Sequence, residues 1–289
     1  MEIEKCKALL CAIELGSITA AAERLEYTTS GISRMLAALE AETGFSMLKR
    51  SRKGVIPTTD CEQLLPIMRE LVYHADCYEQ TVESIHGLKK GTITIGVSYG
   101  MYLRRIAKLI ALFENKYPEI EFATLQGTSS ELTEAIRQHK CDFCIISWRD
   151  GDHDWIPLKK DELQFMIAKN HKLAKEKTIP LSCINEETFI EIYPQKETDN
   201  SRCLEKNHII VQDHFMCRDM ISAMAMVEAG LGITIVNGVS TQTLKGDVVF
   251  RSIEPKEYVE IGIAVPSLQA ISPAARAFLK FIKQHLDDV

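Results

Sequence analysis

Long apolar segments are missing from this sequence of 289 residues. No run approaches the roughly 18 apolar residues that a membrane-spanning helix needs. The first ten residues, MEIEKCKALL, mix acids and lysines and lack the apolar stretch of a signal peptide. We therefore expect a cytoplasmic protein with no membrane partner, and its length allows two domains because single cores stop growing at roughly 250 residues.

The motifs of common enzyme classes are missing too. The sequence has no nucleophile elbow, phosphate-binding loop, dinucleotide fingerprint or zinc motif. We therefore expect no catalytic site, no cofactor and no metal. The solute-binding proteins of transporters need a signal peptide, so that class is also disfavoured. Positive charge is scarce overall, since the formal net charge is -6, and any contact with nucleic acid must depend on a local cluster.

Cysteine is plentiful but has no disulfide pattern. Nine cysteines at irregular spacings favour reduced thiols over a secreted disulfide framework. Cys141 and Cys144 lie on a predicted strand, where side chains three positions apart point to opposite faces, so we expect them not to meet. Cys203 and Cys217 flank another predicted strand and leave a redox-responsive protein as an alternative, although little beside them favours a thiolate.

The first 58 residues show the pattern of a helix-turn-helix. An amphipathic helix ends at Gly16, Thr19 can cap a second short helix, and Thr28 or Thr29 caps a third that runs to about Glu42. In such a motif the later helix enters the major groove of DNA. A generic three-helix bundle followed by a solvated basic turn fits the same pattern.

Candidate DNA contacts gather at the start of the third helix and in the basic turn behind it. Small hydroxyl groups approach phosphates and bases without steric conflict, and a helix N-terminus favours phosphate. The turn lies between two short predicted strands, as a wing would, and carries four positive charges within five residues. The predicted DNA contacts are Thr28, Thr29, Ser30, Ser33, Arg34, Arg50, Arg52 and Lys53.

The run LLCAIELGSITAAAERLEYTTSGISRMLAALEAETGFSMLKRSRKGVIPTT closely resembles the DNA-binding region of LysR-type transcriptional regulators. The matching features are GSITAAAERL, SRMLAALE and the segment LKRSRKGV. The resemblance implies a winged helix-turn-helix over residues 1–58. It departs from the family at Thr29-Ser30-Gly31, where Gln-Pro-Ala is frequent, so the base preference of relatives does not transfer to this chain.

Residues 59–90 are predicted to form a linker helix and a hinge. Apolar residues spaced alternately four and three apart make an a/d seam over three heptads, which is typical of a coiled-coil pair. A helix packed on its own domain is the alternative, and Pro66 is expected to bend the first turns. The LysR resemblance places a dimerising helix here and implies a homotetramer. The seam residues are Leu64, Met68, Leu71, Ala75, Tyr78, Val82 and Ile85.

Strand and helix patterns alternate through residues 91–289, which predicts an α/β domain. We expect two lobes, one of residues 91–161 with 267–289 and one of residues 162–266, and a strand at Ile209–Gln212. The segments TITIGV, ALFENKYPEIEF, DFCIIS, NHKLA and MVEAGLGITIV are similar to the effector domain of the LysR type, which resembles periplasmic binding proteins.

An effector pocket is expected between the lobes, at the carboxyl ends of the strands. Ser98 and the hydroxyls at 128–130 lie where helices begin, which favours an anionic ligand such as a carboxylate; simple helix capping is the alternative. The positions that the resemblance places in the pocket are Ser98, Tyr99, Thr128, Ser129, Ser147, Tyr193 and Met216.

These features together predict a sequence-specific DNA-binding transcription regulator whose output a small-molecule effector controls. Its expected partners are double-stranded DNA, the effector and further copies of the chain, with RNA polymerase as another candidate. Redox regulation through Cys203 and Cys217, or a two-lobed enzyme, are the alternatives. Salt-sensitive binding to duplex DNA separates a regulator from an enzyme.

Overall fold

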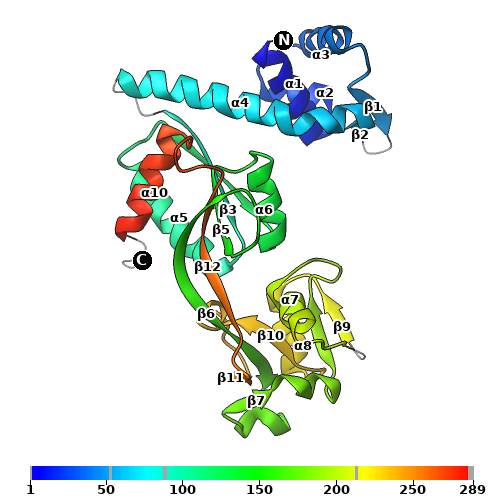
Figure 1. The fold of residues 1–289 in the computed structure, drawn as a ribbon, viewed down its shortest axis with the longest axis vertical. Helices are drawn as coiled ribbons and strands as arrows, with labels where there is room; N and C mark the ends of the chain where they lie inside the picture. The colour runs from blue at the N-terminus through cyan, green and yellow to red at the C-terminus, as the bar shows by residue number, and fades with distance from the viewer. Residues whose placement is uncertain (1, 52–53, 87–89, 212–213, 286–289) are drawn as a thin grey trace.

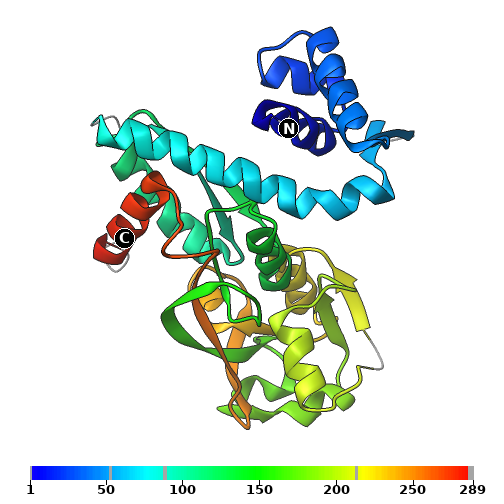
Figure 2. The same ribbon diagram turned by 45° about the horizontal axis from the view of Figure 1, so that its top comes forward.

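The computed structural model describes residues 2–51, 54–86, 90–211 and 214–285. A small helical domain lies at one end, a long helix crosses the molecule, and a two-lobed α/β domain makes up the rest (Figure 1). In the turned view the helical domain stands away from the two-lobed domain, with the long helix between them (Figure 2). Among the described residues, no helix has the length and apolarity needed to cross a membrane.

The N-terminal domain is a winged helix-turn-helix. Its elements are α1 (Ile3–Leu15), α2 (Ile18–Arg24), α3 (Thr29–Thr43) and the antiparallel pair β1 (Leu48–Ser51) and β2 (Gly54–Pro57). The second helix begins earlier than the sequence suggested, because the Ser17 hydroxyl accepts a hydrogen bond from the Ala20 amide at 3.2 Å and is the N-cap. Thr19 therefore lies inside the helix and the expectation that it caps α2 is wrong.

The linker helix α4 (Thr59–Ile85) has two environments along its 27 residues. Its first turns, which contain Pro66, pack into the core of the N-terminal domain, where Met68 is buried. Further along, the helix crosses one lobe of the effector domain and Leu71, Tyr78 and Ile85 stay exposed. The predicted seam is thus divided, and its second half presents an uncovered apolar stripe.

The first lobe is built on the parallel strands β3, β4 and β5, and its helices pack against this sheet. Buried aromatic and branched side chains from α5, α10 and the strands form one continuous core. The elements are β3 (Gly91–Val97), α5 (Gly100–Glu114), β4 (Ile120–Gln126), α6 (Ser129–Arg137), β5 (Phe143–Ser147), β12 (Tyr258–Val265) and α10 (Pro273–His285).

The second lobe grows from the far half of the long strand β6 (Asp154–Ala168). The first half of β6 pairs with β12, and the second half pairs with β10 and β11, so one continuous strand connects the lobes. The other elements are β7 (Thr178–Pro180), β8 (Phe189–Ile192), α7 (Asp199–Lys206), β9 (His214–Cys217), α8 (Met220–Glu228), β10 (Thr234–Asn237), α9 (Gly238–Thr241), β11 (Val248–Glu254) and two 3₁₀ helices, Lys172–Lys175 and Leu181–Asn185.

Two expectations about the second lobe need correction. Strand β12 pairs with β5 from Ile261 onward, and Ile261 and Ile263 lie in the core of the first lobe, so the chain returns there along β12 and not after residue 266. Residues 209–211 form no strand, because this stretch follows directly from α7 and the Ile209 amide donates to the Leu204 carbonyl. Gln212 lies outside the described residues.

The C-x-x-C pair also departs from expectation. Cys141 precedes β5, so the strand alternation that would separate it from Cys144 does not apply. Both thiols are buried in the same apolar cluster beside α6. Burial, reinforced by the neighbouring thiol, raises the pKa of Cys144 well above its ordinary value, which marks it as an inert core cysteine.

Candidate functional site

The first turns of α3 present hydroxyl and guanidinium groups to solvent. Thr28 caps the helix by accepting a hydrogen bond from the Gly31 amide at 3.0 Å, and the Ser33 hydroxyl donates to the Thr29 carbonyl at 2.8 Å. The opposite face of α3 is buried through Ile32 and other apolar residues. The exposed set contains all five contacts predicted on this helix, Thr28, Thr29, Ser30, Ser33 and Arg34.

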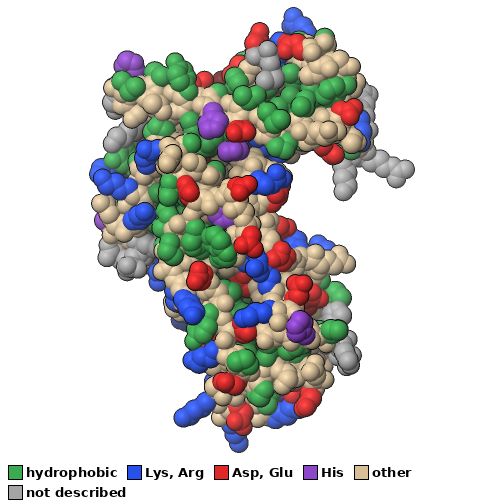
Figure 3. All heavy atoms as spheres, viewed as in Figure 1, with side chains coloured by type: hydrophobic (Ala, Val, Ile, Leu, Met, Phe, Trp, Pro, Cys, Tyr) green, Lys and Arg blue, Asp and Glu red, His purple; other side chains and the backbone are tan. Residues whose placement is uncertain are grey.

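The two-stranded wing contains part of the predicted basic turn. Ser51 and Gly54 are the last pair of its described ladder. Arg52 and Lys53 lie outside the described residues, and only the backbone of Arg50 is described. Acidic and basic side chains are interspersed over the face of the molecule in Figure 3, in keeping with the net charge of -6. Any attraction to DNA must therefore be local.

The wing is docked on the turn between α1 and α2. The Val55 amide donates to the Gly16 carbonyl at 2.9 Å. Gly54 has φ +103°, and a Cβ at this position would lie 2.0 Å from the Gly16 oxygen. Only glycine fits this combination of positive φ and close backbone approach, so the wing has a defined position beside the helix-turn-helix.

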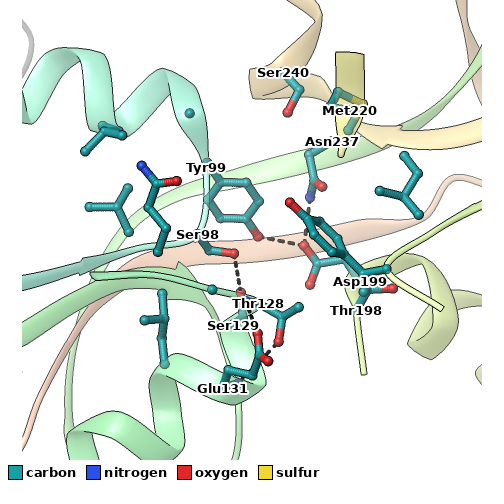
Figure 4. A pocket seen from close by; sticks show the side chains of 18 of the residues that line it. Ser98, Tyr99, Thr128, Ser129, Glu131, Thr198, Asp199, Met220, Asn237 and Ser240 are labelled. Atoms are coloured by element: carbon teal, nitrogen blue, oxygen red, sulfur yellow. Dashed lines mark hydrogen bonds between the residues drawn. The ribbon is translucent and has the colours of Figure 1, made fainter. Parts of the chain in front are cut away.

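A cavity of about 960 Å³ lies between the two lobes (Figure 4). The first lobe contributes the residues that follow β3 and β4, at the carboxyl ends of parallel strands, where α/β domains usually bind ligands. The second lobe contributes the segment before α7 and the end of β10. Principal lining residues are Ser98, Tyr99, Thr128 and Ser129 from the first lobe, and Tyr193, Lys196, Asp199 and Asn237 from the second.

The structure brings most of the predicted effector positions together. Five of them line the cavity: Ser98, Tyr99, Thr128, Ser129 and Tyr193. Ser147 is buried beside it and its amide donates to the Ser129 hydroxyl at 3.0 Å. Met216 lies on β9, outside the lining of this cavity, with 58% of its surface exposed. It pairs with Glu191 in the two-stranded β8–β9 sheet.

The carboxylate of Asp199 occupies the polar centre of the cavity. Asp199 is the first residue of α7, and its Oδ2 atom accepts hydrogen bonds from the Tyr99 hydroxyl at 2.6 Å and from Asn237 Nδ2 at 2.9 Å (Figure 4). Its Oδ1 atom accepts from the Ser147 hydroxyl and from Arg149 Nη2, the latter at 3.0 Å. Three of the four donors belong to the first lobe, so this carboxylate joins the lobes.

The groups around Asp199 shift the pKa values of both Asp199 and Tyr99. Burial alone would raise the pKa of Asp199, but the Arg149 guanidinium and the hydrogen bonds from Ser147, Tyr99 and Asn237 together lower it below its ordinary value. Burial, and then the neighbouring carboxylate, raise the pKa of Tyr99 well above its usual range. Tyr99 therefore remains a hydrogen-bond donor at neutral pH.

A second contact between the lobes is more exposed. Lys196 Nζ lies 2.7 Å from Glu131 Oε1, and both side chains are nearly half exposed. Glu131 also completes a capping box with Thr128 at the start of α6. Solvated pairs of this kind contribute little stability, so the buried Arg149–Asp199 pair is the dominant ionic contact between the lobes.

Arg149, Asp199 and Asn237 were not predicted from the sequence. Arg149 lies just beyond β5 and is distinguished only by its burial, which no local pattern reveals. Asp199 follows Thr198, whose hydroxyl accepts from the Ser201 amide at 3.1 Å in a capping box. That Thr-x-x-Ser pattern could have indicated the start of α7, a helix that the sequence patterns had not suggested.

The cysteines proposed for redox sensing lie apart. Cys203 packs in one core cluster of the second lobe, and Cys217 packs at the edge of another. Burial raises the pKa of Cys203 to about 12 and also raises that of Cys217. Neither environment favours a reactive thiolate. Within the described ranges, no group of three or more His, Cys, Asp or Glu side chains is arranged to hold a metal ion.

Comparisons with protein families agree with this architecture. The bacterial regulatory helix-turn-helix model of the lysR family matches residues 3–62, and the LysR substrate binding domain model matches residues 86–287. The uncharacterized HTH-type transcriptional regulator YvbU of Bacillus subtilis is 29% identical over 98% of each chain. The transcriptional dual regulator GltC of the same species is 24% identical over 88% of this chain and 87% of its own.

Solved structures share the whole fold. A full-length OxyR variant from Pseudomonas aeruginosa superimposes with a TM-score of 0.75 at 17% identity, covering 98% of this chain and 94% of that one. Full-length CbnR in complex with its target DNA gives a TM-score of 0.61 at 18% identity, covering 98% and 99%. With two family models covering both domains, the chain belongs to the LysR family of DNA-binding transcriptional regulators that carry a ligand-binding domain.

Proposed function

We propose that this regulator binds operator DNA as an oligomer in the cytoplasm and that a small-molecule carboxylate in the cavity between the lobes controls its output. The observation that supports an effector there is the cavity itself, which hydroxyl groups line at the carboxyl ends of β3 and β4. Hydroxyls and helix N-termini suit an anionic group. Membership of a regulator family supports this role over an enzymatic one.

In this proposal α3 reads bases and the wing holds the phosphate backbone. Ser33 and Arg34 are exposed on α3, where the recognition helix of a winged helix-turn-helix faces the major groove. Arg50, Arg52 and Lys53 are assigned to phosphates because their charge is concentrated in a short turn. Phosphate contacts position the protein without specifying sequence.

Removing one phosphate contact tests this assignment. Arg52→Ala is expected to weaken DNA binding across all sequences and to reduce the slope of log affinity against log salt by about one unit. Lys280→Ala, which removes a charge exposed on α10, is the matched control and should leave the slope unchanged. Equal slopes for Arg52→Ala and the parent chain would take Arg52 off the phosphate-contact list.

Oligomerisation in this proposal begins at the linker helix. The exposed apolar stripe of α4 supports a helix pair, which would hold two recognition helices about one DNA turn apart. Association of effector domains would extend the dimer to a tetramer, and RNA polymerase is a further candidate partner of the DNA-bound form. An effector changes the output only if its affinity differs between two DNA-bound states.

The effector proposal is tested by thermal unfolding of the full chain against small carboxylates, aromatic acids and amino acids. Both tryptophans, Trp148 and Trp155, lie in the effector domain, so their fluorescence reports this domain alone. A ligand at 100 times its dissociation constant should stabilise by about 2.7 kcal/mol. A stabilising carboxylate supports the proposal, whereas hits confined to uncharged or cationic compounds would contradict it.

A further inference from the structure

Three hydrogen-bond donors of the first lobe converge on one carboxylate of the second lobe. We propose that Tyr99, Ser147 and Arg149 form a carboxylate-binding site, occupied here by the side chain of Asp199, and that an effector carboxylate binds by replacing that side chain. The inference deepens the proposed function, because it names the groups that bind the effector and the internal group that competes with it.

Two of the three donors, Ser147 and Arg149, have hydrogen-bond partners other than Asp199. The Ser147 amide donates to the Ser129 hydroxyl at 3.0 Å. Arg149 Nε donates to the Ser130 hydroxyl at 2.8 Å, and its Nη1 donates to the Trp148 carbonyl at 2.9 Å. These partners all belong to the first lobe. Ser147 and Arg149 therefore keep their geometry when the second lobe moves, as a preorganised binding site requires.

Burial makes an empty site costly. Arg149 is 5% exposed, and Ser147 and Tyr99 are also buried. Glu197 approaches Arg149 Nε only to 3.7 Å and its side chain is half exposed, so the loss of Asp199 leaves the buried guanidinium without a close carboxylate, which is strongly destabilising. Departure of Asp199 is therefore expected only when water or another anion takes its place. A carboxylate of external origin is the closest chemical substitute.

Two cavities meet at this carboxylate, so an external anion can reach it. Asp199 and Tyr99 line the cavity of about 960 Å³. Asp199 also lines a second cavity of about 660 Å³, together with Ser147 and Arg149. Asp199 lines both spaces, whereas Ser147 and Arg149 line the second cavity and not the first. An effector carboxylate that displaced Asp199 from Arg149 would release α7 and with it the buried ionic contact between the lobes.

The test removes the internal carboxylate and supplies it from solution. Asp199→Ala deletes the carboxylate group, which formate can replace. Unfolding of the full-length variant is followed by tryptophan fluorescence in sodium formate, in sodium chloride of equal ionic strength, and in neutral formamide. We expect the variant to melt below the parent chain, and about 100 mM formate to raise its Tm by roughly 2–4 °C over chloride and formamide.

Matched variants keep this test decisive. Arg149→Met combined with Asp199→Ala should abolish the difference between formate and chloride, because the cationic donor is gone. Asp199→Ser, with a smaller loss of polarity at the first residue of α7, repeats the measurement if the alanine variant does not fold. Formate that acts no better than chloride on the folded variant would overturn the anion site.

Competition with Asp199 is tested separately with any carboxylate that stabilises the parent chain. The affinity for this carboxylate should rise at least tenfold in Asp199→Ala, because the internal carboxylate no longer competes with it. The affinity should fall at least tenfold in Arg149→Met. Unchanged affinity in both variants would place the effector elsewhere and refute the replacement. A panel without carboxylate hits would count against the proposed effector class, while the formate experiment would still decide the anion site.

Discussion

At the scale of single residues, two buried aspartates of the effector domain titrate in opposite directions. Asp199 faces Arg149, so its pKa is depressed, and the stability it contributes is present above the ordinary Asp value and lost as pH falls through the folded pKa. Asp142 instead accepts hydrogen bonds from the Thr94 amide at 2.8 Å and the Ser272 hydroxyl at 3.2 Å. Burial dominates there and raises the pKa of Asp142 to about 6.

Replacing Asp142 should remove the loss of folding stability that the parent chain shows as the pH rises. Because the folded pKa lies above the unfolded value, the protonated form favours the fold, and stability is lost as pH rises from about 4 through about 6. Asp142→Asn keeps the acceptor for Thr94 without the charge. We expect the parent chain to lose about 2 kcal/mol relative to this variant between pH 4.5 and pH 7.5.

The measurement is urea unfolding followed by tryptophan fluorescence at several pH values. Asp152→Asn, at an exposed position, is the control for the loss of a carboxylate. Parallel pH profiles for the parent chain and Asp142→Asn would show that Asp142 is not the responsible group.

At the scale of elements, the wing depends on one backbone contact. Gly54→Ala places a Cβ against the Gly16 carbonyl at φ +103°, so the wing must leave its docking site. Gly44 also has positive φ, +82°, but a Cβ added there would meet nothing within 4 Å, which makes Gly44→Ala a control for conformational strain alone. Gly44→Ala should cost about 1 kcal/mol and Gly54→Ala clearly more, with a larger loss of DNA affinity.

The readouts are thermal unfolding by circular dichroism and DNA affinity at constant salt. Equal losses for the two variants would mean that the wing tolerates displacement and that its contact with Gly16 is unimportant.

The linker helix is the second element with a clear prediction. Ile85 is 77% exposed on the apolar stripe of α4, which also contains Tyr78 and Leu71. Ile85→Asp should weaken dimerisation about 100-fold or more, because the two-fold axis brings the change into both helices and each buried Ile contributes about 1.5–3 kcal/mol. Ser84→Asp, exposed beside the seam, should have little effect. Sedimentation at graded concentrations measures both, and similar dissociation constants would refute the seam.

At the scale of the whole molecule, α6 connects the cavity to the linker helix. Its N-cap Thr128 and its first residue Ser129 line the cavity. Just beyond its other end, Gln138 accepts a hydrogen bond from Arg69 of α4 at 3.2 Å, and the rings of His139 and Tyr73 lie 4.8 Å apart. Because α6 has only nine residues, a shift at the cavity can reach α4 through a single rigid element.

A double-mutant cycle tests this connection. Asp199→Asn weakens the ionic contact between the lobes, and Tyr73→Ala removes packing between α4 and the effector domain. If α6 couples the two regions, their effects on DNA affinity should deviate from additivity by at least about 0.5 kcal/mol. Lys172→Ala, exposed on the second lobe, replaces Tyr73→Ala in a control cycle and should be additive with Asp199→Asn. Additive effects of the first pair would indicate that the cavity and linker are independent.

The fold of the DNA-binding domain could largely be predicted from the sequence, because the patterns that determine it are local. Caps, glycine stops and the spacing of Ile32, Leu36 and Leu39 determine α3 within a few turns of chain, and the motif around Arg34 carries the family resemblance. The boundaries of the effector lobes were harder to predict, because strands β6 and β12 pair across roughly a hundred residues. No local pattern indicates which lobe such a strand joins.

The sequence alone therefore determined the domain order, the winged helix and the strand ends that line the cavity. Each of these depends on periodicity or capping over short distances. Tertiary structure decided what lies at the cavity centre. Asp199 and Arg149 are fifty positions apart, and only the closure of one lobe on the other brings a carboxylate into a ring of buried donors. Burial and charge pairing, which give this site its chemistry, are properties of the packed fold and not of any segment within it.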